Sequence, residues 1–445
     1  MSPERNADEK MLVKQLAKSV FRRLRKNQFQ TSDEVSREIG ARGIGTNVSA
    51  LRPEIEQIAQ AKAVRPLKIL QVYRTYHPES EGGVEQVIRQ LAIGLNNLGH
   101  TVRVFAPSQS GPATYELDGV NVVTSKLDFV VASCGFTFSG IDEFRRQLEW
   151  ADLVHYHFPW PFADMLHSLS DVSIPSVVTY HSDIVRQKYL LPFYVPLMKR
   201  FFNRVDCIVA TSTQYANSSQ LLRGQTIKPR VIPIGIDEDT FPEVSNNTLE
   251  EVRLKFGEDY FLFVGVLRYY KGLDVLLDAA ISGHFKLVIA GSGPELSRLN
   301  EKYDFEKIPQ VQFAGRVSEE TKMALYKLCK AVVLPSFSRA EAFGVTLLEG
   351  AMMSKPLISA SPESGSSYVN IDGLTGLVAA PNDVQSLKQA MQRLQDNPDW
   401  ARQLGDNARA RYEEKFTGSK NEDSIKPGSS PSGIGDFISS LCPGK

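Results

Sequence analysis

Two carboxylates, Glu341 and Glu349, lie in a stretch whose pattern predicts a strand, a loop and a helix. The apolar run at 331–334 is typical of a buried parallel strand, and the polar loop after it has no helical period. A helical period begins near Gly344, with apolar residues at Val345, Leu348 and Met352. The N-terminus of such a helix offers free backbone N–H groups and a positive dipole end, which suit a diphosphate. Glu349 could then hold a ribose, and Glu341 would lie beside the group attached beyond the phosphates.

The spacing of these glutamates also has an ordinary explanation. Acidic residues are common near helix starts because they complement the helix dipole, and such a spacing also arises by chance. Two cations at another strand end strengthen the chemical interpretation, because Arg268 and Lys271 follow the apolar run at 261–264. They could neutralise a diphosphate leaving group, although most surface lysines and arginines have no such role.

Glycine turns and one histidine add weaker signals. Gly82 and Gly83 join the first predicted strand to its helix, where glycine lets a ligand approach the backbone, but a plain tight turn is an equal alternative. The segment 291–293 looks like part of a dinucleotide-binding fingerprint, but it lacks the third glycine and is weak support for NAD. His181 follows a predicted strand in polar surroundings, and the sequence is equally consistent with a structural and a catalytic role.

No motif in the sequence points convincingly to a metal or another cofactor. The acidic triplet at 237–239 looks like a metal-binding motif, but its place in a linker favours a solvated turn. The four cysteines are far apart and predict neither a zinc site nor a disulfide framework. A Ser-His-Asp signature, a zincin helix and a P-loop are all missing from the sequence. We therefore expect a site that uses no metal and no cofactor.

The length and charge of the chain exclude several classes of protein. Its 445 residues exceed what one core usually holds, so we expect two or three domains. The 51 basic residues are balanced by 51 acidic residues, which argues against nucleic acid as a partner. The sequence has no apolar stretch long enough to span a bilayer and no signal-peptide core, so we expect a cytoplasmic protein.

Alternating strands and helices predict two doubly wound, Rossmann-like domains, which places the chain in the α/β class. The first is expected at 66–240 and the second at 241–417, with a linker at 237–257. Ligands of such sheets bind outside the carboxyl ends of the strands, so a cleft between the domains is the expected site. Predicted strands of the first domain lie at 68–73, 101–105, 153–156, 176–180, 207–210 and 231–234. Those of the second domain lie at 261–264, 286–290, 311–313, 331–334, 357–360 and 376–378.

Both ends of the chain differ from these domains. Residues 1–65 are expected to form a helical extension, in which the segment 10–26 places a narrow apolar face opposite seven basic residues. This pattern is typical of a helix lying in a membrane interface, with packing against the first domain as the alternative. Residues 418–445 are rich in Ser, Gly and Pro and predict a flexible tail.

With these pieces in place, the chain from about Lys68 to about Phe416 resembles the retaining glycosyltransferases of family 4, which have the GT-B fold. The most specific part is the pair Glu341 and Glu349 inside SRAEAFGVTLLEGAM. Supporting motifs lie at 79–85, 231–237, 268–272, 291–294 and 373–377. The stretches HYHFPWPFADMLH, VVTYHSDIVRQK and FVGVLRYYKGLDVLL look closest to bacterial mannosyl- and rhamnosyltransferases of surface polysaccharide synthesis.

The resemblance implies that the second domain binds a nucleotide diphosphate sugar, with GDP-mannose favoured. Glu349 would hold the ribose, Glu341 would contact the sugar, and Lys271 would bind the diphosphate. Arg268 would assist Lys271, in place of the arginine that the family often has at the position of Val266. The other donor-binding residues would be Gly83, Gly291, Phe343, Gly344 and Val345.

The resemblance also implies the chemistry. The catalytic residues would be His181, Glu341, Arg268 and Lys271, with His181 near the reacting centre and the acceptor on the first domain. The anomeric configuration would be kept without a metal, and the acceptor would be a glycan or a lipid-linked sugar. A nucleotide sugar epimerase of the same fold and a catalytically silent binding protein remain as alternatives. If segment 10–26 binds lipid, the enzyme would work at the cytoplasmic face of the inner membrane.

Overall fold

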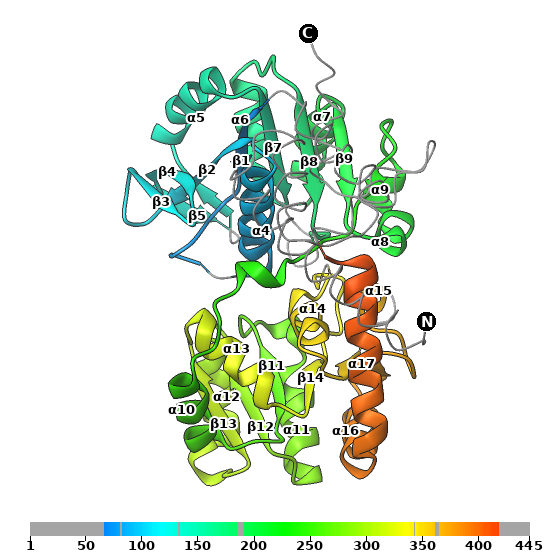
Figure 1. The fold of residues 1–445 in the computed structure, drawn as a ribbon. Helices are drawn as coiled ribbons and strands as arrows, with labels where there is room; N and C mark the ends of the chain where they lie inside the picture. The colour runs from blue at the N-terminus through cyan, green and yellow to red at the C-terminus, as the bar shows by residue number, and fades with distance from the viewer. Residues whose placement is uncertain are drawn as a thin grey trace, which may run out of the picture. The chain divides into compact units, whose positions relative to one another are not determined.

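A computed structural model describes residues 66–80, 82–131, 134–184, 191–341, 343–360 and 365–417. The expectations for the extension at 1–65, the segment 10–26 and the tail at 418–445 fall outside the described residues. Within them, the chain forms two separate mainly parallel sheets, each accompanied by helices (Figure 1). The predicted α/β class with two Rossmann-like domains is therefore confirmed.

The first sheet contains the strands β1 (Lys68–Val72), β2 (Thr101–Ser108), β3 (Ala113–Leu117), β4 (Val120–Lys126), β7 (Leu153–Phe158), β8 (Ser176–Tyr180), β9 (Cys207–Ala210) and β10 (Arg230–Val231). Their order is β10-β9-β8-β7-β1-β2-β4-β3. All neighbours are parallel except β3 and β4. A small antiparallel ribbon joins β5 (Phe129–Val131) to β6 (Cys134–Phe136).

The second sheet is parallel throughout. Its strands are β11 (Phe261–Val264), β12 (Leu287–Ala290), β13 (Val311–Gly315), β14 (Ala331–Leu334), β15 (Leu357–Ser359) and β16 (Gly376–Val378). Their order is β13-β12-β11-β14-β15-β16. This is the Rossmann order, in which the direction of winding reverses between β11 and β14.

Helices connect most of the strands. Those among the strands of the first sheet are α4 (Gly83–Asn97), α5 (Ser139–Trp150), α6 (Pro161–Leu169), α7 (Leu191–Phe202), α8 (Thr213–Ser218) and α9 (Gln220–Arg223). Those that belong to the second sheet are α10 (Asn246–Phe256), α11 (Leu273–Gly283), α12 (Leu296–Tyr303), α13 (Glu319–Leu328), α14 (Val345–Met352), α15 (Ser366–Val369), α16 (Val384–Asp396) and α17 (Pro398–Lys415). Short 3-10 turns lie at Glu238–Thr240, Tyr269–Lys271 and Phe305–Lys307.

The predicted strands agree closely with the observed ones, but the region 113–136 was missed. In that region the structure contains the strands β3 to β6. Strand β3 is mostly exposed, and β5 is fully exposed. Such strands lack the continuous apolar run that marks a strand buried on both faces. The strand expected at 231–234 is also shorter, because only Arg230 and Val231 pair with β9.

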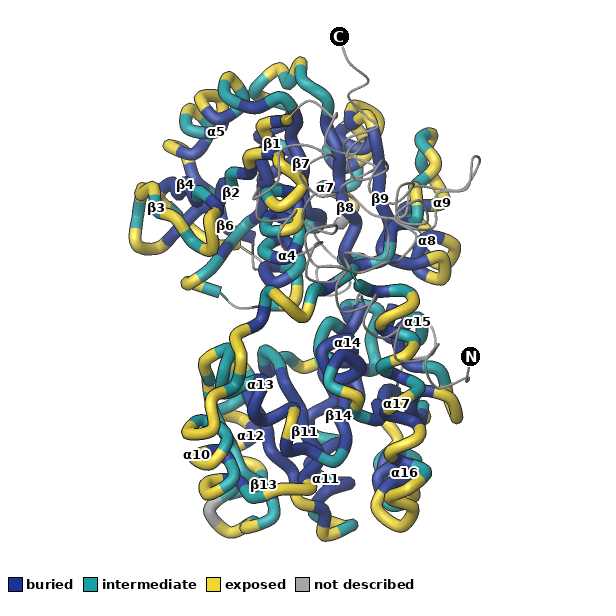
Figure 2. The backbone as a smooth tube through the Cα atoms, in the orientation of Figure 1, coloured by how far each residue is buried: buried dark blue, intermediate teal, exposed yellow. Residues whose placement is uncertain are grey.

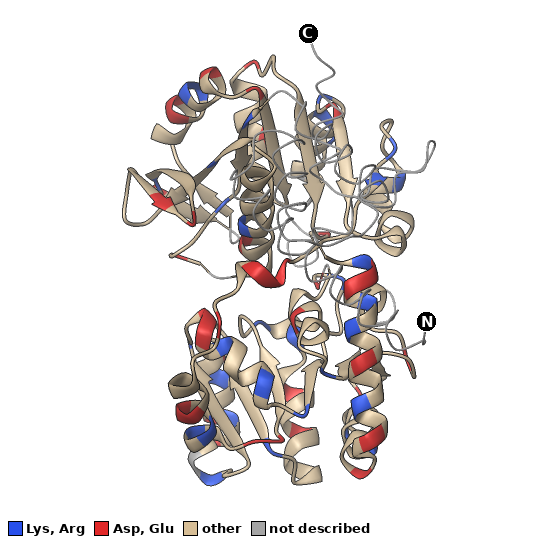
Figure 3. Ribbon diagram, in the orientation of Figure 1, with Lys and Arg blue, Asp and Glu red and all other residues tan. Residues whose placement is uncertain are grey.

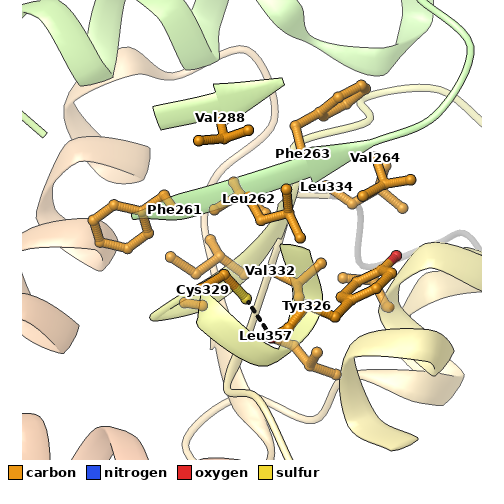
Figure 4. Close-up of a cluster of buried hydrophobic side chains, with 14 of the residues drawn as sticks. Phe261, Leu262, Phe263, Val264, Val288, Tyr326, Cys329, Val332, Leu334 and Leu357 are labelled. Carbon is orange, nitrogen blue, oxygen red and sulfur yellow. Dashed lines mark hydrogen bonds between the residues drawn. The ribbon is translucent and has the colours of Figure 1, made fainter. Parts of the chain in front are cut away.

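The core of the second domain is built from the strands themselves. Side chains of β11, β12 and β14 interdigitate with Tyr326 and Cys329, whose Sγ donates to the Tyr326 carbonyl (Figure 4). Strands β11, β12, β14 and β15 are buried at every residue, whereas the outer faces of the helices are exposed (Figure 2). These buried sheets give a rigid base from which the loops at the strand ends project.

Three surface and side-chain features of the described residues complete the fold. Acidic and basic residues are mixed along α17 rather than segregated (Figure 3). In the part of the chain that the structure covers, no helix combines the length and apolar character needed to cross a membrane.

Cys134, Cys207 and Cys329 are buried and unpaired, and burial raises the pKa of each thiol.

Candidate functional site

The loops that follow β11 and β14 meet at the point where the second sheet changes its winding direction. Because β11 and β14 are neighbouring parallel strands, their carboxyl ends lie at the same edge. Ligands of open α/β sheets bind in the crevice at such a switch point. The predicted residues Arg268, Lys271 and Glu341 all lie in these two loops.

The first loop is shaped so that Lys271 turns back toward the sheet edge. A 3-10 turn over Tyr269–Lys271 is closed by the Lys271 amide, which donates to the carbonyl of Arg268 at 3.0 Å. Gly272 follows in the left-handed region, with φ of 74°. A Cβ atom there would lie 2.2 Å from the carbonyl oxygen of Pro335, so only glycine lets the two loops pack this closely.

Lys271 and Glu341 form a buried ion pair across the two loops. The Lys271 Nζ lies 2.6 Å from Oε2 of Glu341, and both side chains are only 11% exposed. The hydroxyl of Ser336 donates to the same oxygen at 3.1 Å. Burial alone would lower the pKa of Lys271, but the Glu341 carboxylate outweighs it and holds the pKa above its usual value. Lys271 is therefore a fixed cation at the switch point.

Helix α14 begins at the same place and has the predicted boundary. Gly344 caps it with φ of 82°, a conformation that favours glycine. The hydroxyl of Thr346 donates to the carbonyl of Val264 at 3.0 Å, which ties the first turn to the end of β11. Phe343 is buried against Phe416 and is not a free side chain for a ligand. Val345 starts the helix. The amides of Leu347 and Leu348 donate to the Gly344 carbonyl at 2.9 and 3.2 Å, whereas those of Val345 and Thr346 donate to no backbone carbonyl among the described residues.

Glu349 lies in the second turn of α14 and is held by two residues of α13. Its Oε1 accepts from the Lys322 Nζ at 2.9 Å, and its Oε2 accepts from the Tyr326 hydroxyl at 2.7 Å. Burial would lower the pKa of Lys322, but Glu349 and Glu319 raise it above its usual value. Burial and the neighbouring Glu349 raise the pKa of Tyr326 well above its usual range. The carboxylate is therefore pre-oriented, with lone pairs left for further hydroxyl donors.

Lys322 and Tyr326 were not among the candidate residues. Both lie on one face of α13, four positions apart, just before the strand that leads to the glutamates. A lysine and a tyrosine at this spacing share a helix face. This shared face was the one feature of the sequence that could have indicated a joint role for Lys322 and Tyr326. It is weak, since surface helices carry many such pairs.

Arg268 and Gly291 have different surroundings. Arg268 is half-buried, and none of the residues that the structure describes forms a hydrogen bond or an ion pair with its side chain. Gly291 has φ of 138°, and a Cβ atom there would lie 2.1 Å from the Gly265 carbonyl oxygen. Its N–H donates to the Gly315 carbonyl at 2.7 Å. Gly291 thus packs two loops together, and this N–H is already engaged.

The first domain contributes a separate layer of polar residues. His181 follows β8 and is buried, with its Nε2 2.8 Å from the Nδ1 of His157. Burial lowers the pKa of His181 to about 3, so the ring is neutral. His155 and His157 both lie within β7.

Gly83 is exposed and is the first residue of α4. The neighbouring Gly82 leaves room for Glu85, whose carboxylate would lie 2.4 Å from a Cβ at position 82. That carboxylate accepts from the Ser80 hydroxyl at 2.8 Å. The start of α4 is therefore already occupied in part by an acid of the chain itself.

The acidic triplet at 237–239 forms part of a 3-10 turn, and Glu238 pairs with Arg409 at 2.7 Å. Across the described ranges, no group of three or more His, Cys, Asp or Glu side chains is arranged to hold a metal ion. The second domain thus brings together the residue set Lys271, Glu341, Glu349 and the start of α14. His181 and Gly83 belong to the first domain.

Comparison with known proteins adds an independent line of argument. Residues 81–240 match the family model described as Glycosyltransferase Family 4, and residues 245–411 match Glycosyl transferases group 1. The chain is 46% identical over 352 residues to the D-rhamnosyltransferase WbpZ of Pseudomonas aeruginosa, covering 79% of this chain and 92% of that protein. It is 42% identical over 354 residues to the O-antigen chain mannosyltransferase C of Escherichia coli, covering 79% and 95%.

Solved structures show the same fold. The HepE protein of Anabaena, in complex with UDP and glucose, superposes with a TM-score of 0.66 at 17% identity. The match covers 84% of this chain and all of that chain.

Proposed function

Because the chain belongs to the family 4 glycosyltransferases, we propose that it transfers mannose or a related hexose from a nucleotide diphosphate sugar. GDP-mannose is the favoured donor, and the acceptor is a glycan or a lipid-linked sugar of polysaccharide or lipopolysaccharide synthesis. The names of the two relatives, a rhamnosyltransferase and an O-antigen mannosyltransferase, support this substrate class. The observation that carries the proposal is the buried pair of Lys271 and Glu341 at the switch point.

The donor's nucleotide is bound through Glu349 in this proposal. A ribose offers two adjacent hydroxyl donors, and the Glu349 carboxylate is an acceptor only. Hydrogen bonds from Lys322 and Tyr326 fix its direction. A preformed carboxylate loses little freedom when the ribose binds, which favours affinity.

The leaving diphosphate is stabilised by Lys271, by Arg268 and by the N-terminus of α14. When the bond between the anomeric carbon and the phosphate oxygen breaks, negative charge builds up on the diphosphate. Lys271 is already fixed near the helix start, so it need not reorganise as that charge develops. The backbone N–H groups at Phe343, Gly344 and Val345 provide neutral donors in the same region.

Glu341 is assigned to the sugar, and His181 to the reacting centre from the side of the first domain. The carboxylate of Glu341 has a second oxygen beyond the one that Lys271 and Ser336 occupy. A sugar hydroxyl can donate to it. The neutral ring of His181 can accept or donate one hydrogen bond through Nδ1, but it does not carry a charge for a phosphate. Gly83 is assigned to the diphosphate, where an exposed glycine permits close approach.

We also propose a peripheral contact with the cytoplasmic face of the inner membrane through residues 10–26. A lipid-linked acceptor cannot leave the bilayer, so residence at its surface would be useful. Each basic residue near an anionic leaflet contributes about 1 kcal/mol. Full-length protein should sediment with anionic vesicles at low salt, and protein starting near Arg65 should not. Equal sedimentation of both would contradict this role.

The test of the activity is incubation with radiolabelled GDP- and UDP-sugars and a membrane extract. We expect label to move from GDP-mannose to an acceptor, with activity that survives EDTA. Glu349→Ala should slow transfer at donor concentrations below KM, whereas Asp372→Asn, on the exposed bridge near β16, is a control for loss of one carboxylate. An epimerised nucleotide sugar, or binding with no product, would refute transfer.

A further inference from the structure

A continuous line of hydrogen bonds connects a buried glutamine to His181. The Oε1 of Gln71 lies 2.6 Å from the Nε2 of His157, and the Nδ1 of His157 lies 2.8 Å from the Nε2 of His181. Gln71 and His157 are at most 1% exposed, and His181 is 2% exposed. Solvent therefore does not decide which ring nitrogens carry protons.

The parallel sheet places these three side chains in one row. Gln71 lies on β1, His157 on β7 and His181 just after β8, and these strands are neighbours. The backbone register pairs Gln71 with His155 and pairs His157 with Thr179. Each hydrogen bond in the row reaches two positions further along the next strand, and residues two apart share a face of the sheet. The row also crosses the boundary between β1 and β7, where the winding of the first sheet reverses.

The Oε1 of Gln71, at the start of the row, determines which nitrogen of each histidine ring carries a hydrogen. Gln71 is placed with its Oε1 toward His157, and its Nε2 has no partner among the described residues. In this orientation Gln71 can only accept, so the His157 Nε2 that faces it carries the hydrogen. A neutral His157 then has a bare Nδ1, which accepts from the Nε2–H of His181. A neutral His181 in turn has a bare Nδ1. Among the described residues, no hydrogen bond is made to that Nδ1 atom.

The rings are neutral on geometric and electrostatic grounds. His157 and His181 are stacked with centroids 5.1 Å apart, and a second charge in this buried stack would be repelled. Burial lowers the pKa of His181, and burial together with the neighbouring rings lowers that of His157 well below its usual value. The groups that face His157 are Gln71, His155, His181 and Tyr73.

We propose that Gln71 is a positioning residue that holds His181 in the tautomer with hydrogen on Nε2, so that Nδ1 presents a lone pair to a hydroxyl group of the sugar donor or acceptor. The proposal rests on the function assigned above to His181. The group that binds to the Nδ1 of His181 is then an O–H donor, and not a phosphate or carbonyl oxygen.

The same layer contains an internal control. His155 also lies on β7, and its Nε2 is 2.7 Å from the Thr179 hydroxyl. His155 forms no hydrogen bond with Gln71 or His181 among the described residues. Thr179→Val therefore disturbs a buried polar contact of the same kind without touching the row.

The experiment compares three variants of the full chain by nitrogen-15 NMR of the histidine rings at pH about 8, above the ordinary histidine range. In the native protein and in Thr179→Val, the Nδ1 of His181 should have the shift of a bare imidazole nitrogen. In Gln71→Glu the carboxylate at position 71 is still an acceptor, so the Nδ1 of His181 should keep the shift of a bare imidazole nitrogen. Gln71→Met offers no acceptor, so the Nδ1 and Nε2 shifts of His181 should move toward each other. Unchanged shifts in Gln71→Met, or reversed shifts in Gln71→Glu, would overturn the proposal.

Turnover gives the second readout. Gln71→Met should lower kcat about tenfold or more, a part of the 10²–10⁴ that a positioned proton-transfer group contributes, with little change in the KM of the donor. Gln71→Glu should recover most of that loss. If the tautomer behaves as proposed but His181→Ala retains full turnover, the role of His181 fails while the row of hydrogen bonds stands. If His181→Ala is inactive and Gln71→Met is unaffected in both readouts, the role of Gln71 fails alone.

Discussion

Replacing Lys271 by methionine should separate the structural role of the buried pair from its catalytic role. The Lys271 ammonium lies 2.6 Å from Glu341, and each side chain is 11% exposed. Removing one partner of a buried pair typically costs 3–5 kcal/mol. Because this pair is not fully buried and Ser336 still donates to Glu341, we expect a loss near the lower limit, about 3 kcal/mol.

The double variant Lys271→Met with Glu341→Gln should regain most of that stability. It removes both charges, and the amide oxygen at position 341 can still accept from Ser336. Replacing a whole buried pair by uncharged groups is often neutral. Urea unfolding followed by circular dichroism would measure the free energy of unfolding for the two single variants and the double variant.

The kcat of these variants should not change in parallel with their free energy of unfolding. Loss of a fixed donor to a developing negative charge typically lowers kcat 10²–10³-fold, and the double variant still lacks that cation. The kcat of both Lys271 variants should therefore stay low at a temperature where each is fully folded. If activity instead tracks the folded fraction in all three variants, Lys271 is only a structural residue and the reasoning is refuted.

Three further outcomes are expected. Glu349→Ala should weaken binding of the nucleotide diphosphate by about 1.5–3 kcal/mol in calorimetry, and Tyr326→Phe should weaken it by less; unchanged affinity in both would remove the ribose contact. The pKa values of His155 and His181 are lowered to about 3, so the stability they provide is complete above about pH 6.5 and is lost as the pH falls toward 3. Urea unfolding should show a slope of about 1.4 kcal/mol per pH unit for each histidine in that window, and His155→Gln should remove one such contribution. Gly291→Ala should lower stability by about 1–3 kcal/mol, whereas equal unfolding of the variant and the native protein would show that the contact with Gly265 is relaxed at little cost.

The fold of the second domain could be predicted because its strands are short apolar runs bounded by polar loops. The strand Ala331–Leu334 is buried throughout, and Pro335 follows its last residue. The helix start near Gly344 could be predicted because a helical apolar period begins there, and the observed helix starts at Val345. The residues that follow buried parallel strands must gather at one edge of the sheet, which is why Lys271 and Glu341 could be predicted to lie together.

The partners of these residues could not be predicted in the same way. Lys322, Tyr326 and Gln71 act through hydrogen bonds whose existence depends on the register and spacing of elements far apart in the chain. Gln71 in particular is a polar residue inside an apolar strand, and the sequence alone does not show that a histidine faces it from β7. The functions of Gly83 and Gly291 stay predictions, since their packing is visible but a ligand's approach is not.

The distribution of charge in the second domain leads to a last prediction, which concerns Arg268. Glu341 is paired with Lys271 and Glu349 with Lys322, so each buried carboxylate has its own buried cation. A diphosphate must therefore find its net attraction elsewhere in the domain. The start of α14 supplies a partial positive charge, and Arg268 is the half-buried cation for which no carboxylate partner lies within the described residues. If a diphosphate binds here as proposed, Arg268 supplies a charge with no carboxylate partner among the described residues, so we expect Arg268→Ala to weaken diphosphate binding in calorimetry.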